Sequence, residues 1–333
     1  MATLEFITNT VDALDNKKST LAIFLDLSKA FDTINHDILL YKLDFYGIRG
    51  PVYDWIKSYL SDRSQYVQYL GCKSGPMQIK CGVPQGSVIG PLLFIIYMND
   101  LPDCLHNAKG ILFADDTTLY ESSYNINELY ISMNHDLAIL SDWFQSNKLS
   151  LNLKKTNYML FTKASALSEL NHLKVGNEII EKKSCVKFLG IHIDEKLTWT
   201  DHIKVVRSKL ASAIYSINRI KSLIPSRYKR TLYFTLAYPY LAYGIPIWGS
   251  AYSTHKRKLI IMQKKIIRII SGSKYNEHTN PLFCDMHILK VDDIYQVEVA
   301  KLAFKYNQSM LPDPLKCIFM PNNQVCKKQT RQS

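Results

Sequence analysis

Two adjacent carboxylates, Asp115 and Asp116, interrupt the apolar stretch ILFADDTTLY. The flanking residues are good strand formers, which favours a β-hairpin with the acidic pair at its tight turn. Two like charges side by side repel, and a shared proton or a bound cation relieves the repulsion. Carboxylate oxygens suit Mg²⁺, which usually shares its shell with waters and substrate phosphates. The pair therefore indicates phosphoryl-transfer chemistry, with a solvated turn as the alternative because Asp is common in turns.

A third carboxylate, Asp26, lies near the end of the apolar run LAIFLDL (21–27), which has the composition of a buried strand. A carboxylate in such a position is costly unless it is paired or bound to a metal. The order strand, helix, β-hairpin, helix, strand predicts an α+β fold, an antiparallel sheet with helices on one face. In that sheet Asp26 can lie beside Asp115 and Asp116. Three carboxylates suffice to hold two Mg²⁺ roughly 3.5–4 Å apart.

The elements around these residues follow from apolar spacing. Helices are predicted over 1–16, 36–46, 52–60, 92–105 and 125–147, and strands over 158–161, 175–180 and 186–193. A β-hairpin is predicted over 64–81, with Gly71 and a turn at 74–76 between its strands. Beyond about residue 195 the chain is helical and basic, with helices over 200–222, 226–243 and 255–271. Asp32 and Asp37 are interpreted as capping residues.

Two further stretches carry polar groups in unusual settings. GVPQGSVIGP (82–91) has three glycines and two prolines, and Gln85 is its only long polar side chain. Such a backbone can pass close to a ligand, although a structural loop before a core helix explains it equally well. Lys154 and Lys155 precede the strand over 158–161, where lysines are ordinarily solvated.

Charge is divided unequally along the 333 residues. Residues 1–150 hold 11 Lys and Arg against 17 Asp and Glu, whereas residues 151–333 hold 30 against 12. An acidic half that gathers metal ions and a basic half that holds a polyanion fit an enzyme acting on nucleic acid better than a metabolic enzyme.

Composition excludes several classes of protein. The seven cysteines form no Cys-x-x-Cys pair, so we expect reduced thiols in an intracellular protein, and a structural role for Cys284 and His287 rather than a metal site. Residues 1–16 resemble an amphipathic helix rather than a signal peptide. The uncharged run 231–254 is long enough to span a bilayer, but its prolines, glycines and tyrosines favour two packed helical pieces over a membrane span.

Five ordered motifs together resemble the palm motifs of reverse transcriptases, most closely those of non-LTR (LINE-type, jockey-like) retrotransposons. They are FLDLSKAFDTINH (24–36), GVPQGSVIGPLLFIIYMNDL (82–101), FADDTTLY (113–120), LNLKKT (151–156) and KFLGIHID (187–194). The resemblance implies a palm over 21–195 and a thumb-like and C-terminal helical, basic region over 196–333. Residues 1–20 would be a remnant of the fingers or a connecting helix.

The resemblance also implies roles for individual residues. Asp26, Asp115 and Asp116 would bind two Mg²⁺, for which Mn²⁺ could substitute, with the Leu27 carbonyl as an extra ligand. Phe31 would be the steric gate against a ribose 2′-hydroxyl. The other implied contacts are Gln85 and Gly86 with the incoming nucleotide and template, Lys155 or Lys154 as proton donor to pyrophosphate, and Leu189 and Gly190 in the primer grip.

The function expected from this resemblance is RNA-directed DNA polymerase activity, with an RNA template, a DNA primer and dNTPs as partners, no membrane, and the nucleus as location. Only about 25 residues precede Asp26, so most of the fingers is missing from this sequence, and no apurinic-type endonuclease domain is present in it. The chain is therefore expected to be a fragment or truncated copy of a retrotransposon open reading frame. Two alternatives remain: a catalytically inactive RNA-binding fragment of such an element, and a structural protein unrelated to polymerases. The sequence does not indicate an oligomeric state.

Overall fold

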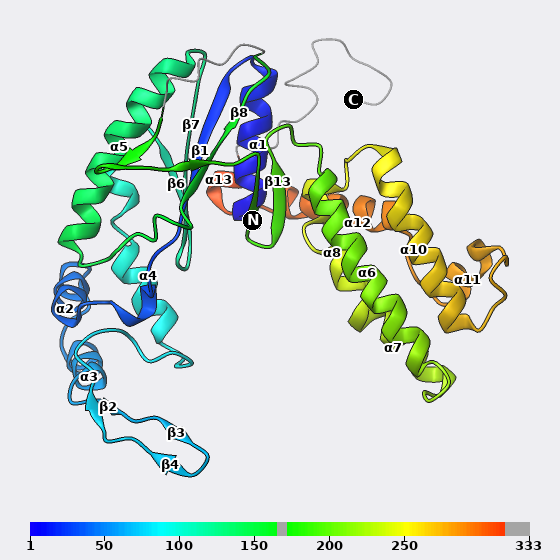
Figure 1. The fold of residues 1–333 in the computed structure, drawn as a ribbon, viewed down its shortest axis with the longest axis horizontal. Helices are drawn as coiled ribbons and strands as arrows, with labels where there is room; N and C mark the ends of the chain where they lie inside the picture. The colour runs from blue at the N-terminus through cyan, green and yellow to red at the C-terminus, as the bar shows by residue number, and fades with distance from the viewer. Residues whose placement is uncertain (165–171, 317–333) are drawn as a thin grey trace. The chain divides into compact units, whose positions relative to one another are not determined.

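The computed structural model describes residues 1–164 and 172–316, so residues 317–333, the end of the predicted basic region, lie outside the described part (Figure 1). The chain divides into two compact units. One unit comprises residues 12–183. The other begins at residue 184 and includes residues 3–11, which lie within the first helix, α1 (Ala2–Asp15), at the place predicted.

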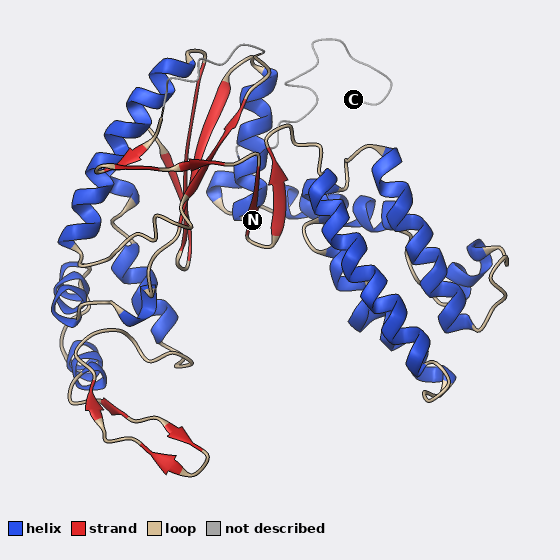
Figure 2. Cartoon of the chain, in the orientation of Figure 1, coloured by secondary structure: helices blue, strands red, loops and turns tan. Residues whose placement is uncertain are grey.

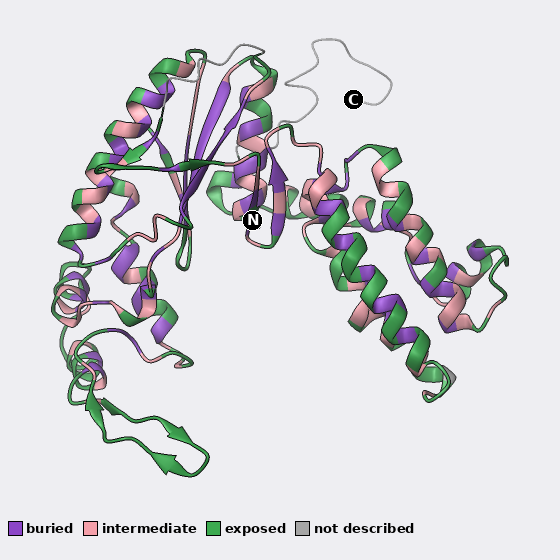
Figure 3. Ribbon diagram, in the orientation of Figure 1, coloured by how far each residue is buried: buried purple, intermediate pink, exposed green. Residues whose placement is uncertain are grey.

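A five-stranded sheet organises the unit of residues 12–183 (Figure 2). Its strands are β1 (Ser19–Leu25), β6 (Lys109–Phe113), β7 (Asp116–Ser123), β8 (Asn157–Phe161) and β11 (Glu181–Lys182), in the spatial order β11-β8-β1-β7-β6. All neighbours are antiparallel except β11 and β8, which are parallel. The apolar run of β1 takes an inner position and is buried at every residue, as its composition predicts (Figure 3).

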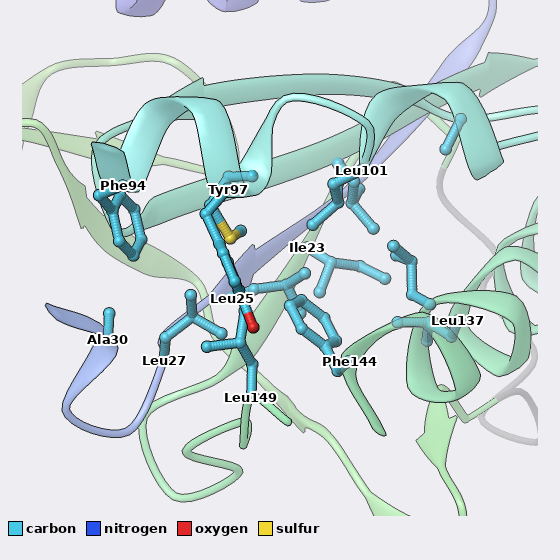
Figure 4. Close-up of a cluster of buried hydrophobic side chains, with 14 of the residues drawn as sticks. Ile23, Leu25, Leu27, Ala30, Phe94, Tyr97, Leu101, Leu137, Phe144 and Leu149 are labelled. Atoms are coloured by element: carbon cyan, nitrogen blue, oxygen red, sulfur yellow. The ribbon is translucent and has the colours of Figure 1, made fainter. Parts of the chain in front are cut away.

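Helices α4 (Gly90–Met98) and α5 (Ile126–Ser146) lie on one face of this sheet. Helix α2 (His36–Phe45) packs against α4, and α3 (Pro51–Leu60) packs against α2. Alternate residues of β1, Ile23 and Leu25, pack with Phe94 and Tyr97 of α4 and with Phe144 of α5 in one core cluster (Figure 4). The predicted α+β architecture, a sheet with helices on one face, is therefore confirmed.

One charged group lies inside this helical layer. Lys42 of α2 is buried, and its Nζ donates to the Tyr97 carbonyl oxygen at 2.6 Å and to Asp100 Oδ1 at 2.7 Å. Its ammonium also lies 4.8 Å from the centre of the Trp143 ring. Burial lowers the pKa of Lys42, while Asp100 acts in the opposite direction. Lys42 thus connects α2, α4 and α5 through polar contacts.

Several predicted elements differ in detail. The helix predicted over 92–105 ends earlier, at Met98, and a short 3-10 helix over Pro102–Cys104 follows. The predicted strand over 175–180 is a small hairpin of β9 (Lys174–Val175) and β10 (Glu178–Ile179), because Gly176 adopts a positive φ and turns the chain.

The hairpin predicted over 64–81 is present and exposed (Figure 3). Its pairs are β2 (Ser64–Gln65) with β5 (Met77–Gln78) and β3 (Gln68–Tyr69) with β4 (Cys72–Lys73). The turn lies at Leu70 and Gly71, both at positive φ, so Gly71 is in the turn as predicted, whereas the predicted turn at 74–76 is not where the chain reverses. Two consecutive residues at positive φ form a turn whose twist matches that of paired strands.

The second unit contains one β-hairpin and a set of helices. The hairpin is β12 (Cys185–Phe188) and β13 (Ile191–Asp194), so the strand predicted over 186–193 turns back on itself. The helices are α6 (Thr200–Ile220), α7 (Ser226–Leu236), α8 (Tyr238–Ala242), α9 (Ile245–Trp248), α10 (Ser253–Ser271), α11 (Thr279–Asp285), α12 (Val291–Asn307) and α13 (Asp313–Lys316). The uncharged run 231–254 thus forms short helices interrupted at its prolines and glycines. Among the described residues, no helix combines the length and hydropathy needed to cross a membrane.

Candidate active site

The acidic pair lies where β6 turns into β7. Phe113 pairs with Asp116, so Ala114 and Asp115 are the two loop residues and Asp116 begins the outgoing strand. Ala114 has a φ of 51°, which an L-residue adopts at a cost of about 1–2 kcal/mol. Both carboxylates belong to exposed residues. The tight hairpin was predicted correctly, but only Asp115 lies within the turn itself.

The strand register brings Asp26 to the same end of the sheet. The last pair between β1 and β7 joins Leu25 to Thr117, and Asp26 follows Leu25 as Asp116 precedes Thr117. In an antiparallel pair these two acidic residues are therefore neighbours across the strands, and opposite residues project to the same face. The register therefore places Asp26 and Asp116, which are 90 positions apart in the sequence, at the same end of the sheet, next to the turn that contains Asp115.

Asp26 is held through its backbone. Its N–H donates to Thr156 Oγ1 at 3.3 Å, and its carbonyl oxygen accepts from the Asn152 N–H at 2.8 Å. Its Oδ2 is buried and has no hydrogen-bond partner among the described residues, although Lys155 Nζ lies 3.5 Å away. A buried carboxylate oxygen without a donor is costly, and the nearby ammonium only partly offsets that cost. Of the two candidate lysines, Lys155 is the one in contact with Asp26.

The backbone carbonyl of Leu27 does not take part in pairing with the neighbouring segment. Leu27 is bridged to Leu151, with the Ser28 N–H donating to the Ser150 carbonyl and Asn152 donating to Asp26. In this type of antiparallel pair, the N–H and C=O of the central residue point away from the partner strand. The Leu27 carbonyl is thus directed away from residues 150–152.

The donor set is chemically suited to a hard divalent cation, since it consists of carboxylate oxygens and a carbonyl oxygen. Asp26 Oδ2 accepts no hydrogen bond from a described residue and has only Lys155 Nζ nearby, so a bound cation would satisfy it. Within residues 1–164 and 172–316, however, no group of three or more His, Cys, Asp or Glu is arranged to hold a metal ion. The acids meet at one end of the sheet without forming a coordination shell by themselves.

Phe31 lies in a short 3-10 helix, Ala30–Asp32, which follows β1. Its half-buried ring stacks on Phe94 of α4, with centroids 4.5 Å apart and planes 29° apart. Its carbonyl oxygen accepts from the Val83 N–H at 2.9 Å. The aromatic side chain is therefore held against the core five residues beyond Asp26.

The loop over residues 82–91 is tied to the same segment. The Gly82 N–H donates to the Ile34 carbonyl at 2.7 Å, and the Gly82 carbonyl lies 2.8 Å from His36 Nε2. A Cβ added at Gly82 would lie 2.7 Å from the Asp32 carbonyl oxygen, and its φ is 85°. Glycine is required here for both reasons.

Asp32 orients Gln85. Gln85 Nε2 donates to Asp32 Oδ1 at 2.8 Å, and because a carboxylate only accepts hydrogen bonds, the amide oxygen of Gln85 must face the other way. Asp32 is therefore no helix cap, and the capping prediction was wrong. Asn35 caps α2 instead, since its side chain accepts from the Ile38 N–H at 3.0 Å. Gly86, at a φ of 81°, has open space around its Cα.

Within the second unit, Leu189 and Gly190 form the two-residue turn between β12 and β13, both at positive φ. Tyr243 Oη donates to the Leu189 carbonyl oxygen at 2.6 Å. A Cβ on Gly190 would approach the Tyr243 ring to 3.2 Å. The predicted strand over 186–193 is thus a hairpin, and its contact with Tyr243, more than fifty residues later, has no signal in the sequence.

A second residue that sequence reasoning missed is Asp136 of α5. Its side chain is fully buried and accepts hydrogen bonds from the backbone N–H groups of His106, Asn107 and Ala108 at 3.3, 2.9 and 2.7 Å. These residues lead directly into β6 and so into the acidic hairpin. Burial by itself would raise the pKa of Asp136, but the three backbone hydrogen bonds outweigh it and lower the pKa.

Comparison with known proteins gives this site its family. Residues 2–193 match the family described as "Reverse transcriptase (RNA-dependent DNA polymerase)". The chain is 32% identical over 294 residues to the probable RNA-directed DNA polymerase from transposon BS of Drosophila melanogaster, covering 85% of this chain and 32% of that protein. It is 29% identical over 317 residues to the RNA-directed DNA polymerase from mobile element jockey of Drosophila funebris, covering 91% and 34%.

Among solved structures, telomerase from Candida albicans in complex with a TWJ fragment of telomeric RNA is similar, with a TM-score of 0.47 and 12% identity over 86% of this chain and 54% of that one. The chain spans about a third of the length of the curated relatives named above. The matched residues include all three carboxylates, Phe31 and the loop over 82–91. The chain belongs to the reverse transcriptase (RNA-dependent DNA polymerase) family.

Proposed function

We propose that this chain carries the polymerase core of a non-LTR retrotransposon and extends a DNA primer on an RNA template with dNTPs. The single observation that supports it best is the register of β1 and β7, which makes Asp26 a neighbour of Asp116 beside the turn that holds Asp115. Family membership supplies the reaction class. The palm would comprise residues 21–195, residues 1–20 would be a fingers remnant or connecting helix, and residues 196–333 would be thumb-like.

In the proposed reaction the primer 3′-oxygen bonds to the α-phosphorus of the dNTP, and the bond from that phosphorus to the pyrophosphate oxygen breaks. The hydroxyl proton passes to water, and Lys155 donates a proton to the leaving pyrophosphate. Asp26, Asp115, Asp116 and the Leu27 carbonyl would hold two Mg²⁺, or Mn²⁺ as a substitute, which lower the pKa of the attacking hydroxyl and stabilise the leaving oxygen. The position of Lys155, 3.5 Å from Asp26, supports its role.

Substrate selection would fall to the segment that follows β1. Phe31, whose ring stacks on Phe94, would exclude a ribose 2′-hydroxyl by contact with the sugar. Gln85, whose amide is oriented by Asp32, and Gly86 would contact the incoming nucleotide and the template. In the second unit, Leu189 and Gly190 would grip the primer end. The nucleus would be the place of action, as the family resemblance implies.

Primer extension on an RNA template tests the proposal. Asp115→Ala should reduce incorporation of dNTPs by more than about 100-fold, because a catalytic metal supplies several kcal/mol of transition-state stabilisation. Asp54→Ala, which removes an exposed carboxylate from α3, is the matched control and should leave the rate within twofold. Equal incorporation by Asp115→Ala and wild type would reject the assignment.

A second candidate is a catalytically inactive RNA-binding chain. The excess of 30 Lys and Arg over 12 Asp and Glu in residues 151–333 favours it, since a basic surface binds RNA without any reaction. Salt-dependent RNA binding with no incorporation, even when a fingers segment from a relative is supplied in trans, would identify this function. Incorporation that depends on Asp115 would exclude it.

A further inference from the structure

A cavity of about 640 Å³ lies within the second unit, between the end of α6, the start of α7 and the second half of α10. We call it the basic pocket; its lining residues include Lys221, Lys229, Ile261, Lys265, Arg268 and Tyr275. The three helices that build it pack on one another (Figure 1). Its volume falls in the range of pockets that bind ligands of several hundred daltons.

The charge of the basic pocket is positive and uncompensated. Four of its residues are Lys or Arg, and no Asp or Glu lines it. Over residues 202–276 the sequence contains fifteen Lys and Arg and no Asp or Glu at all. In the part of the chain that the structure describes, the ion pairs involve other lysines, such as Lys204 and Lys256. Arg268 Nε donates to the Glu277 carbonyl oxygen at 2.9 Å, which leaves its positive charge in place. Like charges around one cavity repel one another, so their concentration here indicates a polyanionic ligand.

The pocket also offers apolar surface. Tyr275 is 92% exposed and Ile261 is 58% exposed, although both are large apolar side chains. Cations beside an exposed aromatic ring are the combination with which proteins bind single-stranded nucleic acid, because the cations hold phosphates and the ring stacks on an unpaired base. A duplex offers phosphates, but its bases are already stacked on one another.

We propose that the basic pocket binds a single-stranded segment of RNA, with phosphates on Lys221, Lys229, Lys265 and Arg268 and an unpaired base against Tyr275. The choice of RNA rests on the proposed function, in which RNA is the template. The pocket goes beyond that function, because binding here needs neither Mg²⁺, nor dNTP, nor a paired primer. It would hold a template stretch that has not been copied.

The first test measures binding of the whole chain to a fluorescently labelled, single-stranded RNA of twenty nucleotides without structure, by anisotropy, without Mg²⁺ or dNTPs. Lys229→Glu/Lys265→Glu should weaken binding by at least tenfold and lower the slope of log K against log salt by about 1.4, at about 0.7 for each lost phosphate contact. The matched control is Lys258→Glu/Lys264→Glu, which makes the same change of net charge on α10 outside the pocket and should weaken binding less than threefold. An equal loss of RNA affinity in the two double variants would overturn the proposal that RNA binds in the basic pocket.

The second test separates a single strand from other ligands. Tyr275→Ala removes an exposed ring, so the variant should fold as wild type does. It should weaken the binding of single-stranded RNA about 5- to 150-fold and leave the affinity for an RNA–DNA duplex within twofold of wild type. The proposal would be overturned if Tyr275→Ala reduced the affinity for the single strand and for the duplex equally, or reduced neither. It would also be overturned if polyglutamate displaced the RNA at equal charge concentration.

Asp115→Ala distinguishes this proposal from the proposed function, because it should bind the single strand as wild type does. If the pocket variants bind RNA more weakly, but neither wild type nor any variant incorporates dNTPs, the polymerase assignment is wrong and the RNA-binding role of the pocket is supported. If Asp115→Ala abolishes dNTP incorporation, but the pocket variants and the control variant bind RNA equally well, the polymerase assignment is supported and the RNA-binding role of the pocket is rejected.

Discussion

Asp136→Asn tests how the acidic hairpin is anchored. Asp136 accepts three backbone N–H groups from residues 106–108, immediately before β6. A hydrogen bond to a charged group contributes about 1.5–3 kcal/mol, and Asn keeps one acceptor oxygen but turns an NH₂ group towards a backbone N–H. We therefore expect the free energy of unfolding to fall by about 2–4 kcal/mol, because one charge-assisted bond is lost and one buried N–H is left unpaired.

Urea denaturation followed by circular dichroism measures this loss. Asp142→Asn, an exposed position on the same helix, is the control and should stay within about 0.5 kcal/mol of wild type. The pKa of Asp136 is lowered on folding, so its carboxylate contributes stability above its unfolded pKa of about 3.9 and loses it as the pH falls through the folded value. The difference in the free energy of unfolding between wild type and Asp136→Asn should therefore have its full value at pH 7 and become smaller below about pH 4. A difference under 0.5 kcal/mol at pH 7, or one that persists at pH 2.5, would refute the reasoning.

Three other substitutions give separate tests. Phe31→Ala should raise incorporation of ribonucleotides relative to deoxynucleotides by at least tenfold in primer extension, and unchanged discrimination would remove its role as the gate. Gly82→Ala should destabilise the chain by about 2–4 kcal/mol in urea denaturation, since the new methyl group meets the Asp32 carbonyl at a positive φ; a neutral effect would contradict this geometry. Tyr243→Phe removes the hydroxyl bonded to Leu189 and costs about 0.5–1.5 kcal/mol, and it should raise KM for primer–template while leaving kcat within twofold; a fall in kcat alone would argue against a positioning role.

Local patterns predicted much of this fold. The central strand, the long helix α5 and the acidic hairpin were predicted because apolar periodicity and turn chemistry act over a few residues. Two of the strand predictions failed because the chain reverses inside an apolar run, at Gly176 in one case and at Leu189 and Gly190, both at positive φ, in the other. A pattern of apolar residues alone does not tell a strand from a tight hairpin of the same length.

The site was predictable only in its residue types and motifs. Nothing in the sequence pairs Asp32 with Gln85, or Tyr243 with Leu189, because each contact depends on how distant segments pack. Asp136 was equally invisible, since an isolated acidic residue on a helix ordinarily faces solvent. Asp26 was distinguished from the other acidic residues because it lies in an apolar run, and the family resemblance implied its role. The strand register then supplied its position beside the acidic hairpin.

Asp26 and the hairpin containing Asp115 should bind the same divalent ions, and iron-mediated cleavage tests this shared site most directly. With Fe²⁺ in place of Mg²⁺ and with ascorbate and peroxide added, hydroxyl radicals cut the backbone nearest the bound metal. We expect two cuts, one near residue 26 and one near residue 115, and both should disappear when excess Mg²⁺ competes. Cleavage near only one of these positions, or cleavage that excess Mg²⁺ leaves unchanged, would contradict it.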